Sequence, residues 1–148
     1  MSDAEAEVFK ALREGQNRYT YFLLAAVGGT IALVVNQTSG RALSFSQIPL
    51  ALAVGCWGLS FVFGCRYLAY VNSSLYANME LFRIQRGEHP VVGSHPEMIE
   101  AGCEGITAAV EHNSERANRL AKWQFRMFVI GALFYLAWHV AEMYLRTN

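Results

Sequence analysis

The chain has 148 residues, of which 53% are hydrophobic and only 16% are charged, and its 12 basic and 12 acidic residues cancel to a net charge of zero. Soluble domains average about 25% charged residues, so this composition excludes a disordered chain and argues against an ordinary soluble enzyme. It also excludes a nucleic-acid partner that needs a broad basic surface. The composition instead predicts an all-α membrane protein, with the lipid bilayer as its main surroundings.

The first segment, residues 1–18, is expected to be a cytoplasmic amphipathic helix. Val8, Phe9 and Leu12 form a short apolar stripe at helical spacing, and Gly15 marks the expected end of a helix over residues 3–14. Such helices lie in the plane of the membrane interface and serve as anchors. A gate or a docking element is the functional alternative for this segment.

Three apolar stretches follow, and they predict transmembrane helices over residues 19–35, 48–66 and 123–145. The first two stretches carry no charge between Tyr19 and Val35 or between Ile48 and Cys65, and the core of the third, residues 127–141, has His139 as its only strongly polar residue. A helix needs about 20 mainly apolar residues to cross the hydrocarbon core. Residues 36–47 are then an outer loop.

The distribution of basic residues predicts the orientation of these three crossings. Three basic residues precede the first crossing and six lie between Arg66 and Lys122, whereas the outer loop holds only Arg41 and the tail only Arg146. Basic residues remain on the cytoplasmic side during insertion. We therefore expect a cytoplasmic N-terminus and an outer tail at residues 146–148, with the cell (inner) membrane as the location.

Residues 67–122 are expected to be an antiparallel helical hairpin that extends transmembrane helices 2 and 3 into the cytoplasm. The stripe on its first helix consists of Leu68, Val71, Leu75, Met79 and Phe82, and helix 2 is expected to run from about Ser46 to Arg86. A polar loop over residues 87–105 is expected at the tip. The second helix carries a comparable stripe, formed by Ile106, Val110, Asn113, Ala117, Leu120 and Gln124. Two narrow helices bury too little apolar area to stand alone, so the hairpin needs a neighbour.

The tip holds the weak candidates for a metal site, His89, His95 and Cys103. Imidazole and thiolate are zinc ligands, but the spacing of these three residues matches no established zinc motif. The alternative is a polar connector with two tight turns, in which Ser94 or Pro96 opens a short helix. No cofactor is expected.

The transmembrane segments offer few polar side chains and many small ones. The candidates for lining a pore are Thr30, Ser60, His139 and Glu142. As the alternative, His139 and Glu142 form a hydrogen-bonded pair at the outer interface. Small residues spaced four apart let helices approach closely in lipid and favour a homo-oligomer. The residues expected to pack helices are Ala25, Gly28, Gly29, Ala32, Ala51, Gly55, Ser60 and Gly64.

These features support three classes of function. The leading hypothesis is a homo-oligomeric channel- or pore-like subunit that is gated through its cytoplasmic hairpin. The second is a membrane-anchored adaptor or effector subunit whose hairpin tip docks a soluble signalling or defence protein. The third is a metal-dependent membrane enzyme that uses the three metal-site candidates, and an enzyme is not expected. In architecture alone, the plan resembles that of small prokaryotic membrane effectors and channel-like subunits.

Overall fold

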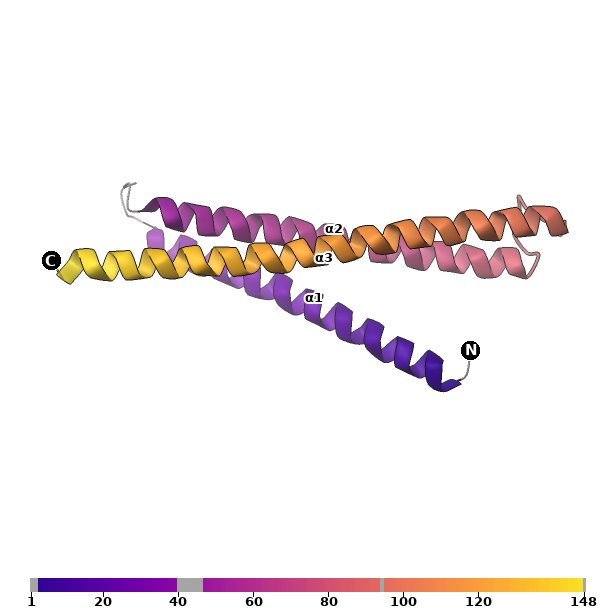
Figure 1. Cartoon of the computed structure of the whole chain (residues 1–148), viewed down its shortest axis with the longest axis horizontal. Helices are drawn as coiled ribbons and strands as arrows, with labels where there is room; N and C mark the ends of the chain where they lie inside the picture. The colour runs from indigo at the N-terminus through magenta and orange to yellow at the C-terminus, as the bar shows by residue number, and fades with distance from the viewer. Residues whose placement is uncertain (1–2, 40–46, 94, 148) are drawn as a thin grey trace. The chain divides into compact units, whose positions relative to one another are not determined.

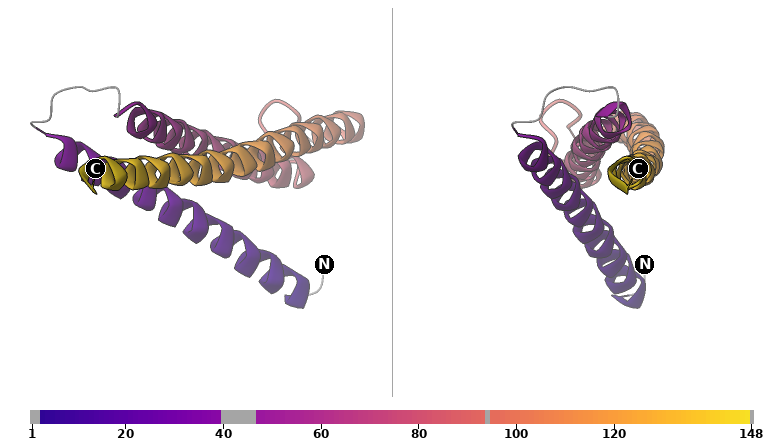
Figure 2. Two further views of the ribbon diagram at one scale, coloured as in Figure 1. Left: turned by 60° about the vertical axis from the view of Figure 1, so that its left-hand side comes forward. Right: turned by 90° about the vertical axis from the view of Figure 1, so that its left-hand side faces the viewer.

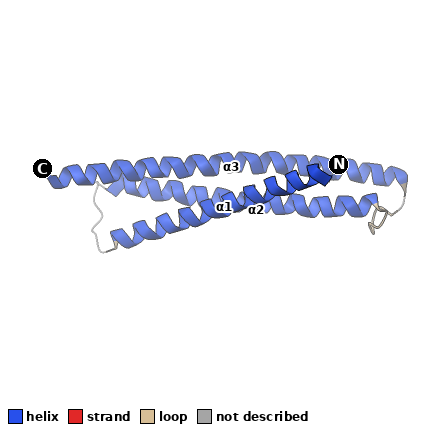
Figure 3. Cartoon of the chain, turned by 90° about the horizontal axis from the view of Figure 1, so that it is seen from below, coloured by secondary structure: helices blue, strands red, loops and turns tan. Residues whose placement is uncertain are grey.

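The computed structural model describes residues 3–39, 47–93 and 95–147, and these form three helices (Figure 1). They are α1 (Asp3–Thr38), α2 (Ile48–Gln85) and α3 (Pro96–Thr147). The described residues contain no strand, which confirms the predicted all-α class (Figure 3). Each helix contains a segment that is long and apolar enough to cross a membrane. Most of the predicted outer loop, the loop residue Ser94 and the last residue of the tail lie outside the described residues.

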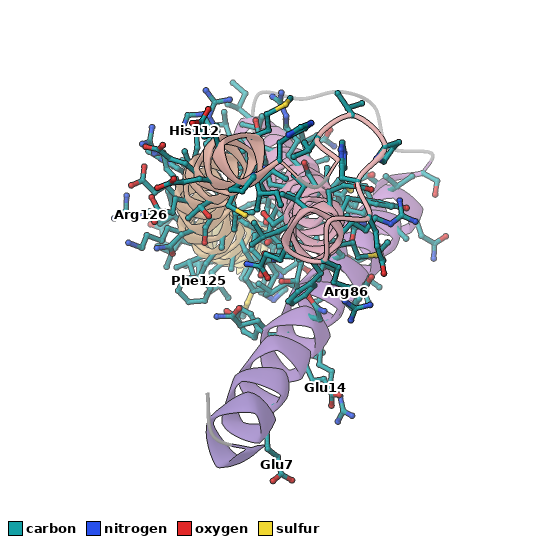
Figure 4. The ribbon with its side chains drawn as sticks, turned by 90° about the vertical axis from the view of Figure 1, so that its right-hand side faces the viewer. Glu7, Glu14, Arg86, His112, Phe125 and Arg126 are labelled. Atoms are coloured by element: carbon teal, nitrogen blue, oxygen red, sulfur yellow. The ribbon has the colours of Figure 1, made fainter. Side chains whose placement is uncertain are left out.

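Helix α1 does not end near Gly15, so the prediction of a separate N-terminal helix is wrong. One helix runs from Asp3 to Thr38 through the glycine. A single glycine in a helix costs only about 1 kcal/mol relative to alanine, and its neighbours Glu14, Gln16 and Arg18 are good or neutral helix formers. No proline follows to complete the break, and the backbone therefore stays helical. Figure 4 shows Glu7 and Glu14 projecting outward from this part of α1.

The chain divides into two compact units. The first, here called the three-helix unit, comprises residues 1–64 and 123–148, and the second, the hairpin unit, comprises residues 65–122. Helices α2 and α3 each contribute a segment to both units. The boundaries lie at or within two residues of the positions where the hydropathy of the sequence changes, 66/67 and 122/123.

All three helices contribute to the core of the three-helix unit. Partly buried aliphatic and aromatic side chains pack around this core, among them Ile31, Phe128 and Tyr135. The interior is therefore a close-packed apolar cluster, in which side chains fill the space between the helices. The buried members are Val27 and Val34 of α1, Leu50, Ala53 and Trp57 of α2, and Trp138 of α3.

In the hairpin unit, α2 ends in a glycine cap. The N–H of Gly87 donates to the carbonyl of Ile84 at 2.9 Å, and the N–H of Glu88 donates to the carbonyl of Arg83 at 3.0 Å. Gly87 adopts a φ of 69°, which glycine tolerates because it has no Cβ. This pair of bonds is the Schellman arrangement, and it ends α2 within one residue of the predicted position.

Helix α3 begins at Pro96, so the loop predicted over residues 87–105 is too long. The N–H of Ile99 donates to the carbonyl of His95 at 3.0 Å, which makes Pro96 the first helical residue. Proline is favoured there because its fixed φ suits a helix and its missing N–H would have no partner. Near its start α3 contains Gly102, which lies close to α2. A Cβ at this position would lie only 3.2 Å from Ile84 Cδ1, so the glycine permits close packing of the two helices.

The two helices of the hairpin unit lie side by side, as the two views of Figure 2 agree. The predicted stripe of α3 is buried or half-buried throughout, which confirms that face. The predicted stripe of α2 is wrong at its distal end, because Leu75, Met79 and Phe82 are exposed. The face that packs lies about one residue away, through Ser74, Ala77, Leu81 and Ile84. Small side chains on this face allow the two helices to approach each other.

Candidate functional site

Apolar side chains pack closely in the middle of the three-helix unit. Val27 and Ala53 are completely buried and Trp57 is 3% exposed, so side chains fill the space between the helices. The indole Nε1 of Trp57 donates to the carbonyl of Phe128 at 3.2 Å. Gly131 lies against this indole, because a Cβ added there would be 2.6 Å from two of its ring atoms. The space around Trp57 is therefore closely packed.

Ser60 lies inside the protomer and not on a surface that could line a pore between protomers. Its side chain is fully buried, and its hydroxyl donates to the carbonyl of Gln124 at 2.8 Å. A Cβ at Gly64 would lie 2.6 Å from Gln124 Nε2 and 2.8 Å from Leu24 Cδ2. Ser60 and Gly64 therefore pack helices within one chain, and the buried Ser60 is not placed to line a pore.

The other three pore-lining candidates are less enclosed. The Thr30 hydroxyl is half-buried and bonds to its own helix, at 3.0 Å from the carbonyl of Ala26 and 2.9 Å from that of Val27. His139 is exposed and stacks on Tyr135, with ring centroids 6.4 Å apart and planes inclined by 12°. Glu142 is half-buried on the same helix. Thr30 and His139 thus remain candidates for a surface shared between protomers.

The small residues divide into two groups. Ser60 and Gly64 are used within the protomer, whereas Ala25, Gly28, Gly29 and Ala32 are all exposed on α1. Ala51 and Gly55 are exposed on α2 in the same way. A Cβ at Gly28, Gly29 or Gly55 would meet no atom within 4 Å. These positions are therefore not needed for the packing of one protomer.

The turn between α2 and α3 does not gather the three metal-site candidates. His89 Nδ1 accepts bonds from the N–H groups of Val91 and Val92, each at 3.3 Å, and its Nε2 lies 3.7 Å from Glu80 Oε2. Cys103 lies within α3, where its carbonyl accepts a bond from Thr107. Among the described residues, no three His, Cys, Asp or Glu side chains are placed to hold a metal ion. The contacts of His89 shape the turn.

A recess in the hairpin unit has a basic lining, and sequence reasoning did not identify it. It is an open recess with a volume of about 220 Å³, lined by Arg66 and Tyr70 of α2 and by Arg116, Arg119 and Leu120 of α3. Arg116 Nη1 donates to Tyr70 Oη at 3.2 Å. In the sequence these arginines contributed only to the predicted orientation. Arg116 and Arg119 lie three residues apart on α3, and Arg66 and Tyr70 lie four apart on α2, so each pair lies on one helix face.

The hairpin unit also carries an exposed apolar face on α2. Tyr76 is 71% exposed, Met79 54% and Phe82 60%, and Leu75 lies beside them. Aromatic and thioether side chains gathered on one exposed face are typical of a surface that contacts another molecule. Elsewhere in this unit charged residues project into the surroundings, as Figure 4 shows for His112 and Arg86.

No protein-family model matches the chain, and no curated protein or solved structure matches it either.

Proposed function

We propose that this protein is a homo-oligomeric, channel-like subunit of the cell (inner) membrane, with its pore between protomers and its hairpin unit as the gate. The N-terminus and the hairpin unit lie in the cytoplasm and the C-terminus lies outside, because the basic residues concentrate in those two segments. The observation that carries the proposal is the set of exposed small residues on α1 and α2, which one protomer leaves without packing partners.

The packed interior of the three-helix unit supports a pore shared between copies. Val27, Ala53 and Trp57 are buried between the helices, and this close packing favours a pore between subunits over one within a subunit. Small residues at positions 25, 28, 29 and 32 of α1 share one helix face, which permits close approach of a second helix in lipid. A pore of this kind has mainly apolar walls and closes by dewetting.

The size of the assembly in lipid tests the first half of the proposal. We expect the purified chain in lipid nanodiscs to contain several copies, and Gly28→Leu and Gly55→Leu to reduce that number because leucine fills the faces that must meet. Ala137→Leu is the matched control, since Ala137 is exposed on α3 and lies outside these faces. A single copy per nanodisc for the unaltered chain would contradict the proposal.

Ion flux through reconstituted protein tests the second half. We expect the intact chain to conduct in liposomes, and we expect deletion of the turn at residues 87–95 to change opening without changing the number of copies. Reporter fusions at both termini test the orientation, for which we expect a cytoplasmic N-terminus and an outer C-terminus. Absence of flux from a correctly assembled oligomer would refute the channel.

The exposed apolar face of α2 favours a second candidate, a membrane-anchored adaptor or effector subunit. Tyr76, Met79 and Phe82 lie in the segment that the proposed topology places in the cytoplasm, where lipid tails do not cover them. A soluble signalling or defence protein would dock on the hairpin unit through this face. Replacing all three residues with serine separates the candidates, because an adaptor then loses its partner whereas a channel retains its flux.

A further inference from the structure

We propose that the recess formed by Arg66, Arg116 and Arg119 binds a phosphate group, presented either by a phospholipid headgroup or by a soluble phosphate compound. The bilayer source rests on the membrane topology proposed above. The soluble source does not depend on that topology.

Cationic groups converge on this recess from two helices. Arg66 and Tyr70 lie four residues apart on α2, while Arg116 and Arg119 lie three apart on α3, and all four line the same space. The bond from Arg116 Nη1 to Tyr70 Oη, at 3.2 Å, holds one guanidinium at the wall. Because Tyr70 Oη accepts this bond, its own hydroxyl hydrogen is available to an anion.

The three guanidinium groups have no carboxylate partner among the described residues. Arg83, farther along α2, pairs with Glu80 at 3.2 Å, but no such pair within 4 Å involves an arginine of the recess. On α2 the first acidic residue is Glu80, while on α3 Glu115 precedes Arg116 and no acidic residue follows before Glu142. The three arginines of the recess therefore retain donors for an anion, and Glu115 is the acidic residue nearest to them on α3.

Phosphate is the anion whose chemistry fits this lining. Guanidinium groups present several N–H donors in a planar fork, which matches the oxygens of a phosphate group, and three such groups suit a doubly charged anion. The recess is open, so a terminal phosphate can enter while the rest of its molecule stays outside. Leu120 supplies an apolar wall beside the charges.

The position of the recess along the chain explains why a lipid is one source. Arg66 directly follows the charge-free segment from Ile48 to Cys65, and Arg119 precedes the apolar stretch of α3 by a few residues. If these segments span the membrane as proposed, the recess is level with the cytoplasmic headgroups. Basic pockets at this level bind anionic headgroups.

The test uses the full chain in phosphatidylcholine nanodiscs, with two probes. For the lipid source, a minor fraction of phosphatidic acid is added, and the phosphatidic acid retained on the protein after delipidating washes is measured by native mass spectrometry. For the soluble source, binding of radiolabelled inorganic phosphate is measured without anionic lipid. The test variant combines Arg66→Gln, Arg116→Gln and Arg119→Gln. The matched control removes three charges outside the recess, through Arg83→Gln, Lys122→Gln and Arg126→Gln.

We expect the unaltered chain to bind at least one probe, and each single arginine substitution to weaken binding roughly three- to tenfold, because charge-assisted bonds in an open site are partly screened. The triple recess variant should lose binding, whereas the control should change by less than about twofold. Selective retention of phosphatidic acid identifies a headgroup, and phosphate binding without anionic lipid identifies a soluble ligand.

Two results would overturn the proposal. One is the absence of both binding signals from unaltered protein of normal helix content. The other is an equal loss in the recess variant and the control, which would mean that general positive charge, and not this recess, attracts the anion. Tyr70→Phe adds a finer measurement, for which we expect a smaller loss than for Arg116→Gln. These binding measurements do not report oligomer size or ion flux. The phosphate-site proposal and the channel proposal can therefore be refuted separately.

Discussion

The contact between Gly131 and Trp57 allows a stability prediction to be worked from the structure. In Gly131→Ala, the new Cβ would lie 2.6 Å from Trp57 Cδ1 and Nε1 and 3.1 Å from the carbonyl oxygen of Ala53. Ordinary carbon contacts begin at about 3.5 Å, so the helices or the indole must move by roughly 1 Å. The indole is 3% exposed and donates to the carbonyl of Phe128, and both its packing and its hydrogen bond resist that movement.

The expected cost combines three terms. Overpacking a well-filled core costs about 1–3 kcal/mol, and a lost hydrogen bond costs about 0.5–1.5 kcal/mol. The higher helix propensity of alanine returns about 1 kcal/mol. Gly131→Ala should therefore lower the free energy of unfolding by about 0.5–3.5 kcal/mol. Titration with sodium dodecyl sulfate in mixed micelles, followed by circular dichroism, measures this change.

The matched control is Gly58→Ala, which places the same substitution in the same unit. A Cβ at Gly58 meets no atom within 4 Å, so the helix propensity gain of up to about 1 kcal/mol should raise stability. If Gly131→Ala were as stable as the unaltered chain while Gly58→Ala behaved as expected, the close approach of α3 to Trp57 would be refuted.

Three further predictions concern single contacts. Ser60→Ala should lower the free energy of unfolding by about 0.5–1.5 kcal/mol, because it removes the bond to the carbonyl of Gln124, and the same detergent titration measures it. Gly87→Ala should destabilise the turn by about 1–2 kcal/mol because of its φ of 69°, and faster amide hydrogen exchange at the end of α2 reports this. Thr30→Val should leave protomer stability within about 0.5 kcal/mol, because the hydroxyl bonds only within α1, and it should lower flux if Thr30 lines the proposed pore. Unchanged amide hydrogen exchange at the end of α2 in Gly87→Ala would contradict the second prediction. Ion flux equal to that of the unaltered chain in Thr30→Val would contradict the third.

The sequence predicts helix ends and packed faces well where a glycine or a clear apolar periodicity determines them. The end of α2 was predicted within one residue because Gly87 supplies the positive φ that a glycine cap requires. The packed face of α3 was predicted through Ala117 and Gln124, since its stripe has few competing apolar positions. The all-α class follows directly from three long apolar stretches.

Other features depend on contacts that a single sequence does not display. Helix α1 passes through Gly15 because one glycine costs less than a helix break would. The close contact between Gly102 and Ile84, which lets α3 continue along α2 without a side chain at that point, appears only when the two helices are paired. The packed face of α2 differs from the predicted stripe because the small side chains of Ser74 and Ala77 let α3 approach more closely than the larger Met79 would. The basic recess likewise exists only when α2 and α3 lie side by side.

The same contacts constrain how a gate in this chain would work. Helices α2 and α3 supply both chain connections between the two units, at 64/65 and 122/123. Just inside the three-helix unit, Ser60 bonds to Gln124 and Gly64 lies against the same side chain. Sliding α2 along α3 would break this bond and drive other side chains against Gly64.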